Sequence, residues 1–379
     1  MEKMILANVR VVGSEERDIA VEDGRIAAIG VHASLPDAEK LDCTEITLFP
    51  GFIDVHNHGA VGVDVNEAGV DGLIAVGGYL ARNGVTAWMP TLVPDSDENY
   101  RRVIGEIDKL MKLQVELPIA QAVGVHYEGV FANEKMCGAL RPEYFKKFTG
   151  REVKELPRLK RGVHMTTFAP EVEGGEELAA ELAGNGWIAS IGHSNADVAT
   201  LEKAYVAGAR HVTHFFNAMS GIHHRDVGVA GWALSNPEVT FDIIADGIHV
   251  HPRMLEIACR AKTPEKTILI SDSVAPTGLG DGEFDLWGEK ISVKDKRTSN
   301  ERGSIAGSVI SMYDAVIGMR SIGFSDADVA KMASTNPAKL LGLSESRGSI
   351  ETGKRADLVG IDGTGSIRFV MVGGLPVGI

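Results

Sequence analysis

Along most of the chain, short apolar runs alternate with segments whose apolar residues recur at helical spacing. Helical periodicity is clearest over 70–84 ("VDGLIAVGGYLARNG") and 196–209 ("ADVATLEKAYVAGA"). Buried strands that alternate with helices predict a parallel sheet, and about eight such units predict an α/β protein with a (β/α)8 barrel of the TIM type. The expected strands lie in the segments 52–55, 85–92, 119–129, 162–170, 187–194, 211–217, 239–247 and 267–273.

The two chain ends follow a different pattern. Both consist of short strand-like runs, and the Asp23-Gly24 pair near the N-terminus is typical of a hairpin turn. We therefore predict two domains. Residues 1–48 and 349–379 would form a small β-sandwich domain, and residues 49–348 a catalytic barrel domain.

The amino-acid composition limits the classes of protein to which the chain can belong. The chain has 379 residues, 44% hydrophobic and 24% charged, which is ordinary for a globular protein. No apolar run approaches the ~18 residues of a membrane span, and the N-terminal stretch lacks the order of a signal peptide. Three cysteines without paired spacing favour a reducing compartment and disfavour a thiolate zinc site. We expect a cytoplasmic protein.

The net charge of −14 bears on binding partners. Nucleic acids and anionic membranes are bound mainly through clustered Lys and Arg, so this balance disfavours both. An anionic small molecule would need a strong local positive site.

Candidate chemistry lies where the expected strands end. His56 and His58 are two positions apart at the tip of one strand, so both side chains share a face. In barrels of this class, catalytic groups cluster at the C-terminal ends of the strands. Imidazoles and carboxylates without thiolates suit zinc, with iron, manganese or cobalt also compatible. Each residue alone has a structural explanation, but their joint occurrence predicts a metal site: His56, His58, Glu128, His193, His214 and Asp272.

Longer motifs carry a specific resemblance. The chain contains "PGFIDVHNHG", "GVHYEG", "TFAPE", "GHSNA", "THFFNAMS", "HHRDVGVAG", "DGIHV", "SDSVAPTG" and "GKRADLV". With these motifs the chain resembles the amidohydrolase superfamily, and within it the family of N-acetylglucosamine-6-phosphate deacetylases. The resemblance implies a metal-dependent hydrolase that releases acetate from an N-acetyl-amino-sugar 6-phosphate.

The resemblance also implies roles for individual residues. Glu128, His193 and His214 would hold the principal metal ion, and His56 and His58 a second ion that some members lack. Asp272 would be the catalytic acid and base. The sugar phosphate would be bound by Asn217 and Ala218, by His249 at the sugar, and by Arg225 reaching across from the neighbouring subunit of a homodimer.

The chain departs from the family pattern beside the metal-binding glutamate. Val130 stands where better-known members have proline, and Leu140 where they have a histidine thought to polarise the substrate carbonyl. The metal alone could polarise the carbonyl, another residue such as a histidine of the "HHR" segment could substitute, or the substrate could differ. N-acetylgalactosamine 6-phosphate, or another N-acyl or cyclic amide, is therefore an alternative substrate. A non-catalytic sugar-binding scaffold is a further alternative.

Overall fold

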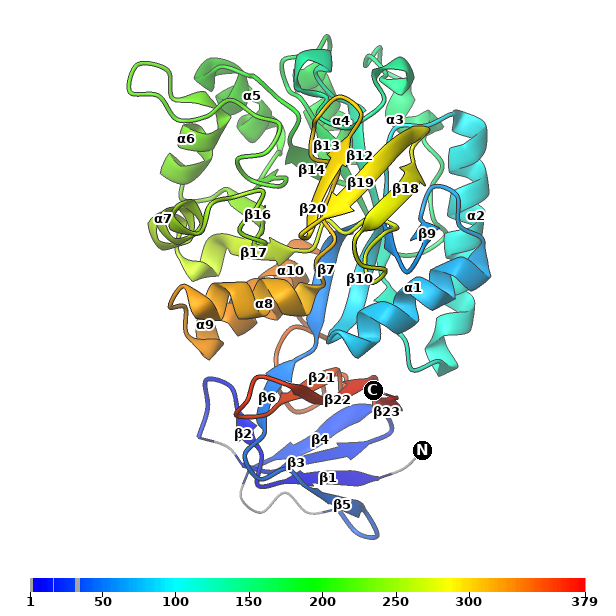
Figure 1. Cartoon of the computed structure of the whole chain (residues 1–379), viewed down its shortest axis with the longest axis vertical. Helices are drawn as coiled ribbons and strands as arrows, with labels where there is room; N and C mark the ends of the chain where they lie inside the picture. The colour runs from blue at the N-terminus through cyan, green and yellow to red at the C-terminus, as the bar shows by residue number, and fades with distance from the viewer. Residues whose placement is uncertain (1–2, 16, 31–34, 379) are drawn as a thin grey trace.

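Figure 1 shows a computed structural model of the chain, which describes residues 3–15, 17–30 and 35–378. The parts of the predicted small domain that fall on residues 1–2, 16, 31–34 and 379 lie outside this description. Eight parallel strands follow one another around a barrel. In order they are β7 (Phe52–Asn57), β10 (Val85–Leu92), β12 (Gly124–Phe131), β13 (Val163–Phe168), β14 (Ile188–Ile191), β15 (His211–Val212), β16 (Thr240–Ile244) and β17 (Thr267–Ile270).

The ring closes between its last and first strands. A parallel bridge joins Asn57 to Ser273. The backbone N–H of Asp272 donates to the carbonyl of His56 at 3.0 Å, and that of His58 donates to the carbonyl of Ser273 at 2.8 Å. The predicted (β/α)8 barrel is confirmed, and its closure places residues 56–58 directly beside residues 272–273.

Helices connect successive barrel strands and cover the outside of the ring (Figure 1). The two segments with the clearest helical periodicity form α1 and α5, as predicted. The helices are α1 (Val70–Arg82), α2 (Asp97–Leu113), α3 (Glu152–Glu155), α4 (Gly175–Gly184), α5 (Val198–Ala207), α6 (Gly228–Ser235), α7 (Pro252–Lys262), α8 (Met312–Ser321), α9 (Asp326–Ala330) and α10 (Asn336–Leu340).

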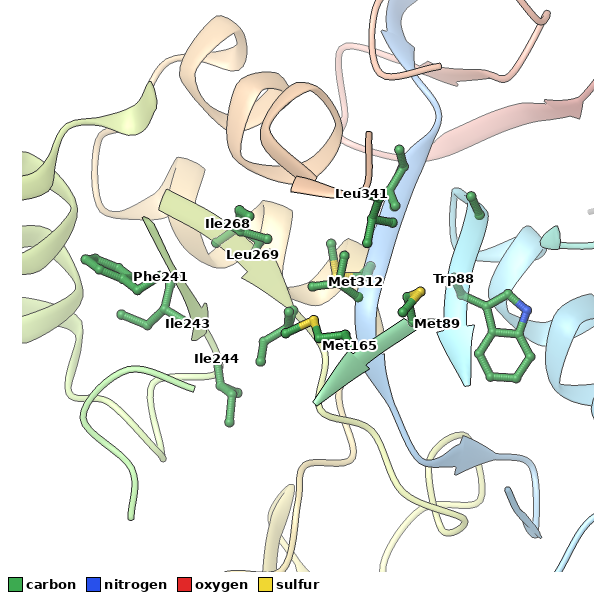
Figure 2. Packing of buried hydrophobic residues seen from close by; sticks show 14 of the residues in the cluster. Trp88, Met89, Met165, Phe241, Ile243, Ile244, Ile268, Leu269, Met312 and Leu341 are labelled. Carbon is green, nitrogen blue, oxygen red and sulfur yellow. The ribbon is translucent and has the colours of Figure 1, made fainter. Parts of the chain in front are cut away.

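Apolar side chains fill the space between strands and helices. Figure 2 shows Met89 of β10, Met165 of β13 and Met312 of α8 in one cluster with Ile268 and Leu269 of β17. Methionine is unbranched and flexible, so it fills irregular gaps between elements that converge at different angles. The strands therefore enclose a packed core, and space for a ligand remains only at their ends.

Both chain ends contribute to a second layered unit. In Figure 1 it lies beyond the end of the barrel at which β7 begins. Its sheets enclose a separate apolar cluster that includes Leu6, Val21, Leu48, Leu358 and Met371. The domain boundaries proposed above stay a prediction. One sheet contains β4 (Arg25–Ile29), β3 (Ile19–Glu22), β1 (Met4–Ala7) and β5 (Glu39–Asp42), and the other β2 (Arg10–Val11), β6 (Thr47–Pro50), β21 (Leu358–Ile361), β22 (Ile367–Val372) and β23 (Leu375–Val377).

An antiparallel sheet is inserted between β17 and α8. It consists of β18 (Gly282–Leu286), β19 (Glu289–Lys294) and β20 (Arg297–Asn300). The turn between β18 and β19 carries Trp287, which is 9% exposed and packs with Val274 just after the end of β17. The insertion is thereby fastened to the rim of the barrel. Among the described helices, none has the length and apolar character required to cross a membrane.

Candidate active site

The first predicted ligand set comes together at the C-terminal ends of three strands. Glu128 lies in β12, and His193 and His214 follow β14 and β15. The Nε2 atoms of both histidines lie 3.0 Å from Glu128 Oε1 and 3.0 Å from each other. Ligand atoms with this spacing can each lie about 2.0 Å from a common zinc-sized ion. Each of the three residues is 4% exposed, so the cluster is shielded from bulk water.

The second set lies beside the first. His56 Nε2 and His58 Nε2 are 3.0 Å apart, and both are 3.4 Å from Asp272 Oδ1. Glu128 lies between the two sets, because its Oε2 atom is 3.1 Å from His58 Nε2. Each set contains three side chains whose ligand atoms could hold one metal ion. The structure thus brings together all six residues that were predicted to form the metal site.

The charges of this cluster are compatible with a cation at its centre. Burial disfavours ionised Glu128, but the charge of His56 and the hydrogen bond from His193 outweigh it and hold the Glu128 pKa well below its usual value. Burial likewise opposes ionised Asp272, and the neighbouring His56 and His58 lower its pKa. Two ionised carboxylates therefore lie within a few ångströms of four imidazoles. A divalent cation would balance them with the imidazoles neutral, which is the state in which histidine binds metals.

Three of these residues have a backbone conformation that L-residues rarely adopt. The φ angles are +48° at His193, +33° at His214 and +50° at Asp272. Left-handed conformations at residues other than glycine are costly and concentrate at functional sites, where surrounding contacts enforce them. All three lie within two residues of a strand end, at the point where the chain turns out of the barrel.

Hydrogen bonds from the opposite ring nitrogen orient two of the imidazoles. His58 Nδ1 donates to the carbonyl of Thr91 at 3.2 Å, and His193 Nδ1 donates to the carbonyl of Met136 at 2.8 Å. A proton on Nδ1 leaves Nε2 as a free lone pair directed into the cluster, as metal ligation requires. The donor set, its spacing and these tautomers all fit a divalent metal ion.

A cleft of about 310 Å³ opens above the two ligand sets. One part of its wall carries Asn217, Ala218 and His249, three of the four residues predicted to bind substrate. His249 Nδ1 is held by Asp246 Oδ2 at 2.6 Å, which fixes the orientation of its ring. These three residues and the ligand cluster therefore face the same cavity.

The fourth, Arg225, does not line the cleft of its own chain. It is exposed in the segment 221–226, and its Nη1 atom lies 2.7 Å from His224 Nε2. Ile222 and Val227, on either side, are 54% and 43% exposed. The histidines of the "HHR" motif share this exposed position, so within one chain they do not replace the missing carbonyl-polarising residue.

Leu140 forms part of the cleft wall and is 3% exposed. It packs so tightly against Gly129 that a Cβ atom at residue 129 would lie 2.3 Å from Leu140 Cδ1. Trp287 also lines the cleft, with its ring edge-on to His58 at a centroid distance of 5.3 Å. Its indole N–H donates a hydrogen bond to Asp64 Oδ2 at 2.8 Å. This part of the cleft is therefore apolar.

Two buried carboxylates that were not predicted from the sequence support the candidate ligands. Asp54 is fully buried, accepts from the Ser271 hydroxyl at 2.6 Å and lies two positions before His56 on the same strand. Burial raises its pKa. Asp242 of β16 accepts from the backbone N–H of His214 at 2.5 Å. A lone aspartate in an otherwise apolar strand was the available signal for both, whereas nothing local to the sequence placed Trp287 at the site.

Comparisons with known proteins agree with this geometry. Residues 47–377 match the model of the amidohydrolase family. The N-acetylglucosamine-6-phosphate deacetylase of Bacillus subtilis (strain 168) is 32% identical, covering 94% of this chain and 93% of its own. The N-acetylgalactosamine-6-phosphate deacetylase of Escherichia coli O157:H7 is also 32% identical, covering 95% and 94%. A deacetylase structure from Mycobacterium smegmatis in complex with N-acetyl-D-glucosamine 6-phosphate superposes with a TM-score of 0.90, at 28% identity and full coverage of both chains.

Proposed function

Because the chain belongs to the amidohydrolase family, we propose that it hydrolyses the acetamide of N-acetylglucosamine 6-phosphate, yielding acetate and glucosamine 6-phosphate in amino-sugar catabolism. The observation that supports this proposal is the cleft, whose wall combines residues of two clusters that could hold a metal ion with Asn217, Ala218 and His249. A scaffold that only bound sugar would not need to bury two ionised carboxylates among four imidazoles.

In this proposal Glu128, His193 and His214 hold one divalent ion, and His56 and His58 hold a second next to Asp272. We propose zinc, because the donors are imidazole nitrogen and carboxylate oxygen atoms without thiolates; iron, manganese and cobalt use similar sets. A cation held there supplies the Lewis acidity that makes water nucleophilic near neutral pH.

Asp272 is the proposed acid and base. Its carboxylate lines the cleft, and the positive charge of the neighbouring His56 and His58 lowers its pKa. A cation held by these two residues would lower it in the same way, so the ionised carboxylate can accept a proton from attacking water. The same carboxyl group can then donate that proton to the departing amine nitrogen, which is too basic to leave as an anion. One residue thereby serves both halves of the reaction.

Other residues that line the same cleft would bind the substrate. We propose that Asn217 and Ala218 contact the phosphate and that His249 contacts the sugar. The guanidinium of Arg225 would complete the phosphate site of the neighbouring subunit in a homodimer, since its planar fork matches phosphate oxygens. Its exposure, between the exposed apolar residues Ile222 and Val227, supports a position at a subunit contact. The cytoplasm is the proposed location.

The test is a turnover panel on the purified protein, with its metal content measured by elemental analysis. The panel contains N-acetylglucosamine 6-phosphate, N-acetylgalactosamine 6-phosphate, both free sugars and N-acetyl amino acids. We expect bound divalent metal and the highest kcat/KM for N-acetylglucosamine 6-phosphate. A preference for the galactose epimer would favour the function of the E. coli relative. Absence of tightly bound metal, or a preference for unphosphorylated amides, would contradict the proposal.

A further inference from the structure

The barrel strand β13 contributes no predicted ligand, although it lies between β12 and β14, which carry Glu128 and His193. Three residues beyond its end is Glu171, the last residue of the "TFAPE" motif, which no step of the proposed reaction uses. We propose that Glu171 is a positioning residue for His193, and that it sets the affinity of the site for its metal ion.

The carboxylate of Glu171 joins two separate loops. Its Oε1 atom accepts from Asn133 Nδ2 at 2.8 Å and from the backbone N–H of Asn195 at 2.6 Å. Its Oε2 atom accepts from the Ser194 hydroxyl at 2.7 Å. Glu171 thus bonds to both residues that follow His193 and to the start of the loop after β12.

The loop after β12 supplies the hydrogen-bond acceptor for His193. Asn133 caps the 3-10 turn η2 (Glu134–Met136), and the carbonyl of Met136 accepts from His193 Nδ1 at 2.8 Å. The backbone N–H of Asn133 also donates to the carbonyl of His193 at 3.1 Å. By fixing Asn133, Glu171 holds in place the carbonyl that determines the tautomer and ring plane of His193.

The backbone of His193 needs such support. Its φ of +48° is unfavourable for a residue with a side chain, and persists only where surrounding contacts over-determine it. Glu171 bonds the backbone at Asn195, and Ser194 is tied in turn to the carbonyl of Ala218 at 3.1 Å. Glu171 therefore restrains both the imidazole ring and the backbone of His193. Partners of metal-binding histidines commonly alter metal affinity 10- to 100-fold.

The hydrogen bonds of Glu171 allow a positioning role to be distinguished from an effect of its negative charge. All three contacts are hydrogen bonds into the carboxylate, and an amide can reproduce them. The amide oxygen of Glu171→Gln can accept from Asn133 and Asn195, and its NH2 group can donate to the Ser194 hydroxyl. Glu171→Ala removes all three contacts. Glu173→Ala is the matched control, because Glu173 lies on the same loop, is exposed and, among the residues that the structure describes, pairs only with Lys147, at 3.2 Å.

The experiment measures the affinity of the metal-free full-length protein for zinc, by competition with a chromophoric chelator, and the visible spectrum of the cobalt-substituted protein. We expect Glu171→Ala to lose about 10- to 100-fold in zinc affinity and to change the cobalt spectrum. We expect Glu171→Gln and Glu173→Ala to stay within about threefold of wild type. If Glu171→Ala does not fold, Asn133→Ala removes one contact and the cap of η2 and should show a smaller loss in the same direction.

The inference rests on the proposed role of His193 as a metal ligand, and the outcomes separate the two. A wild-type protein that binds neither zinc nor cobalt would overturn both. Normal binding by the wild type together with normal affinity and spectrum in Glu171→Ala, or in Asn133→Ala where Glu171→Ala does not fold, would overturn the positioning role alone. An equal loss in Glu171→Gln and Glu171→Ala would also overturn it, because the charge and not the hydrogen-bonded geometry would then matter.

Discussion

The two ends of the barrel are built from the same strands, but their buried charged groups are compensated in different ways. At the C-terminal end, Glu128 and Asp272 are buried among imidazoles, and three residues have left-handed backbone conformations. At the N-terminal end, the guanidinium of Arg347 bonds to the carboxylate of Asp357 and, at 2.6 Å, to Gln121. The first arrangement gathers donor atoms that could hold a cation, whereas the second pairs its own opposite charges.

We infer from this difference that stability and function depend on opposite ends of the barrel. Groups held in costly conformations at one end can be removed with loss of chemistry and with little loss of folding stability. Groups at the other end connect the barrel to the sheets formed by the chain termini, and their removal should impair folding and leave the chemistry intact. Substitutions at each end can test this separation.

Asp272→Asn should have the largest effect. The amide keeps the size of the side chain but cannot accept and return a proton, so kcat should fall by about 10²- to 10⁴-fold, or roughly 3 to 5 kcal/mol. The ion held by Glu128, His193 and His214 should be retained. Steady-state kinetics with metal analysis checks both. Turnover close to wild type would remove Asp272 from the reaction. An unfolded variant would show that the C-terminal end also determines folding stability.

Arg347→Met should have the largest effect at the opposite end. The substitution leaves Asp357, whose side chain is 5% exposed, without its main partner. Removing one member of a buried pair costs about 3 to 5 kcal/mol, and we expect the lower figure because Arg355 and the Gly373 N–H still contact Asp357. Urea unfolding measures the change, and kcat per folded molecule should be unaltered. Arg253→Met, which removes an exposed ion pair, should cost less than about 1 kcal/mol.

The two ends also differ in how far the sequence predicts them. The barrel was predicted from alternating strand and helix patterns. The six candidate metal ligands were predicted from polar residues at strand tips, because both features depend on local periodicity. Trp287 lines the cleft from an inserted sheet, and Glu171 contacts the residues after His193 from the loop that follows β13, so both positions depend on tertiary packing. The ion pair of Arg347 with Asp357 joins residues ten positions apart across a turn, so it cannot be predicted from the periodicity of apolar residues. Leu140 was identified as a departure, but its packing on Gly129 required the structure.

Arg225→Met should have an intermediate effect. This effect depends on the proposed contact with the neighbouring subunit, not on either end of the barrel within one chain. Loss of a charged hydrogen bond to phosphate costs about 1.5 to 3 kcal/mol, so KM for the phosphorylated sugar should rise roughly 10- to 100-fold. Turnover of unphosphorylated N-acetylglucosamine should barely change, and an equal effect on both sugars would contradict the phosphate contact.

Mixing experiments test whether Arg225 acts across subunits. A heterodimer of Arg225→Met and Asp272→Asn chains contains one site with an intact Asp272 and, in trans, an intact Arg225. Activity should therefore reappear when the two inactive or weakened proteins are unfolded and refolded together. Recovery no greater than the sum of the separate proteins would place Arg225 in its own site or outside any site.

His164→Gln should have the smallest effect and probes the N-terminal end by pH. His164 lies at the start of β13, accepts from the backbone N–H of Leu159 at 3.0 Å and packs on Trp187. Burial, helped by the charge of Arg158, lowers its pKa from 6.5 to about 4. Between these values the unfolded chain binds a proton that the folded protein does not, so stability falls as the pH falls.

The glutamine side chain can keep the hydrogen bond to Leu159 but cannot be protonated. The variant should therefore lose less stability than wild type between pH 6.5 and pH 4, by on the order of 1 kcal/mol, a figure reduced because the ring is partly exposed to solvent. Urea unfolding of both proteins across this range gives the difference, in which the common contribution of the metal site cancels. If the free energies of unfolding of the two proteins changed in parallel with pH, His164 would be protonated in the folded protein. The N-terminal end of the barrel would then tolerate a buried charge, as the C-terminal end does.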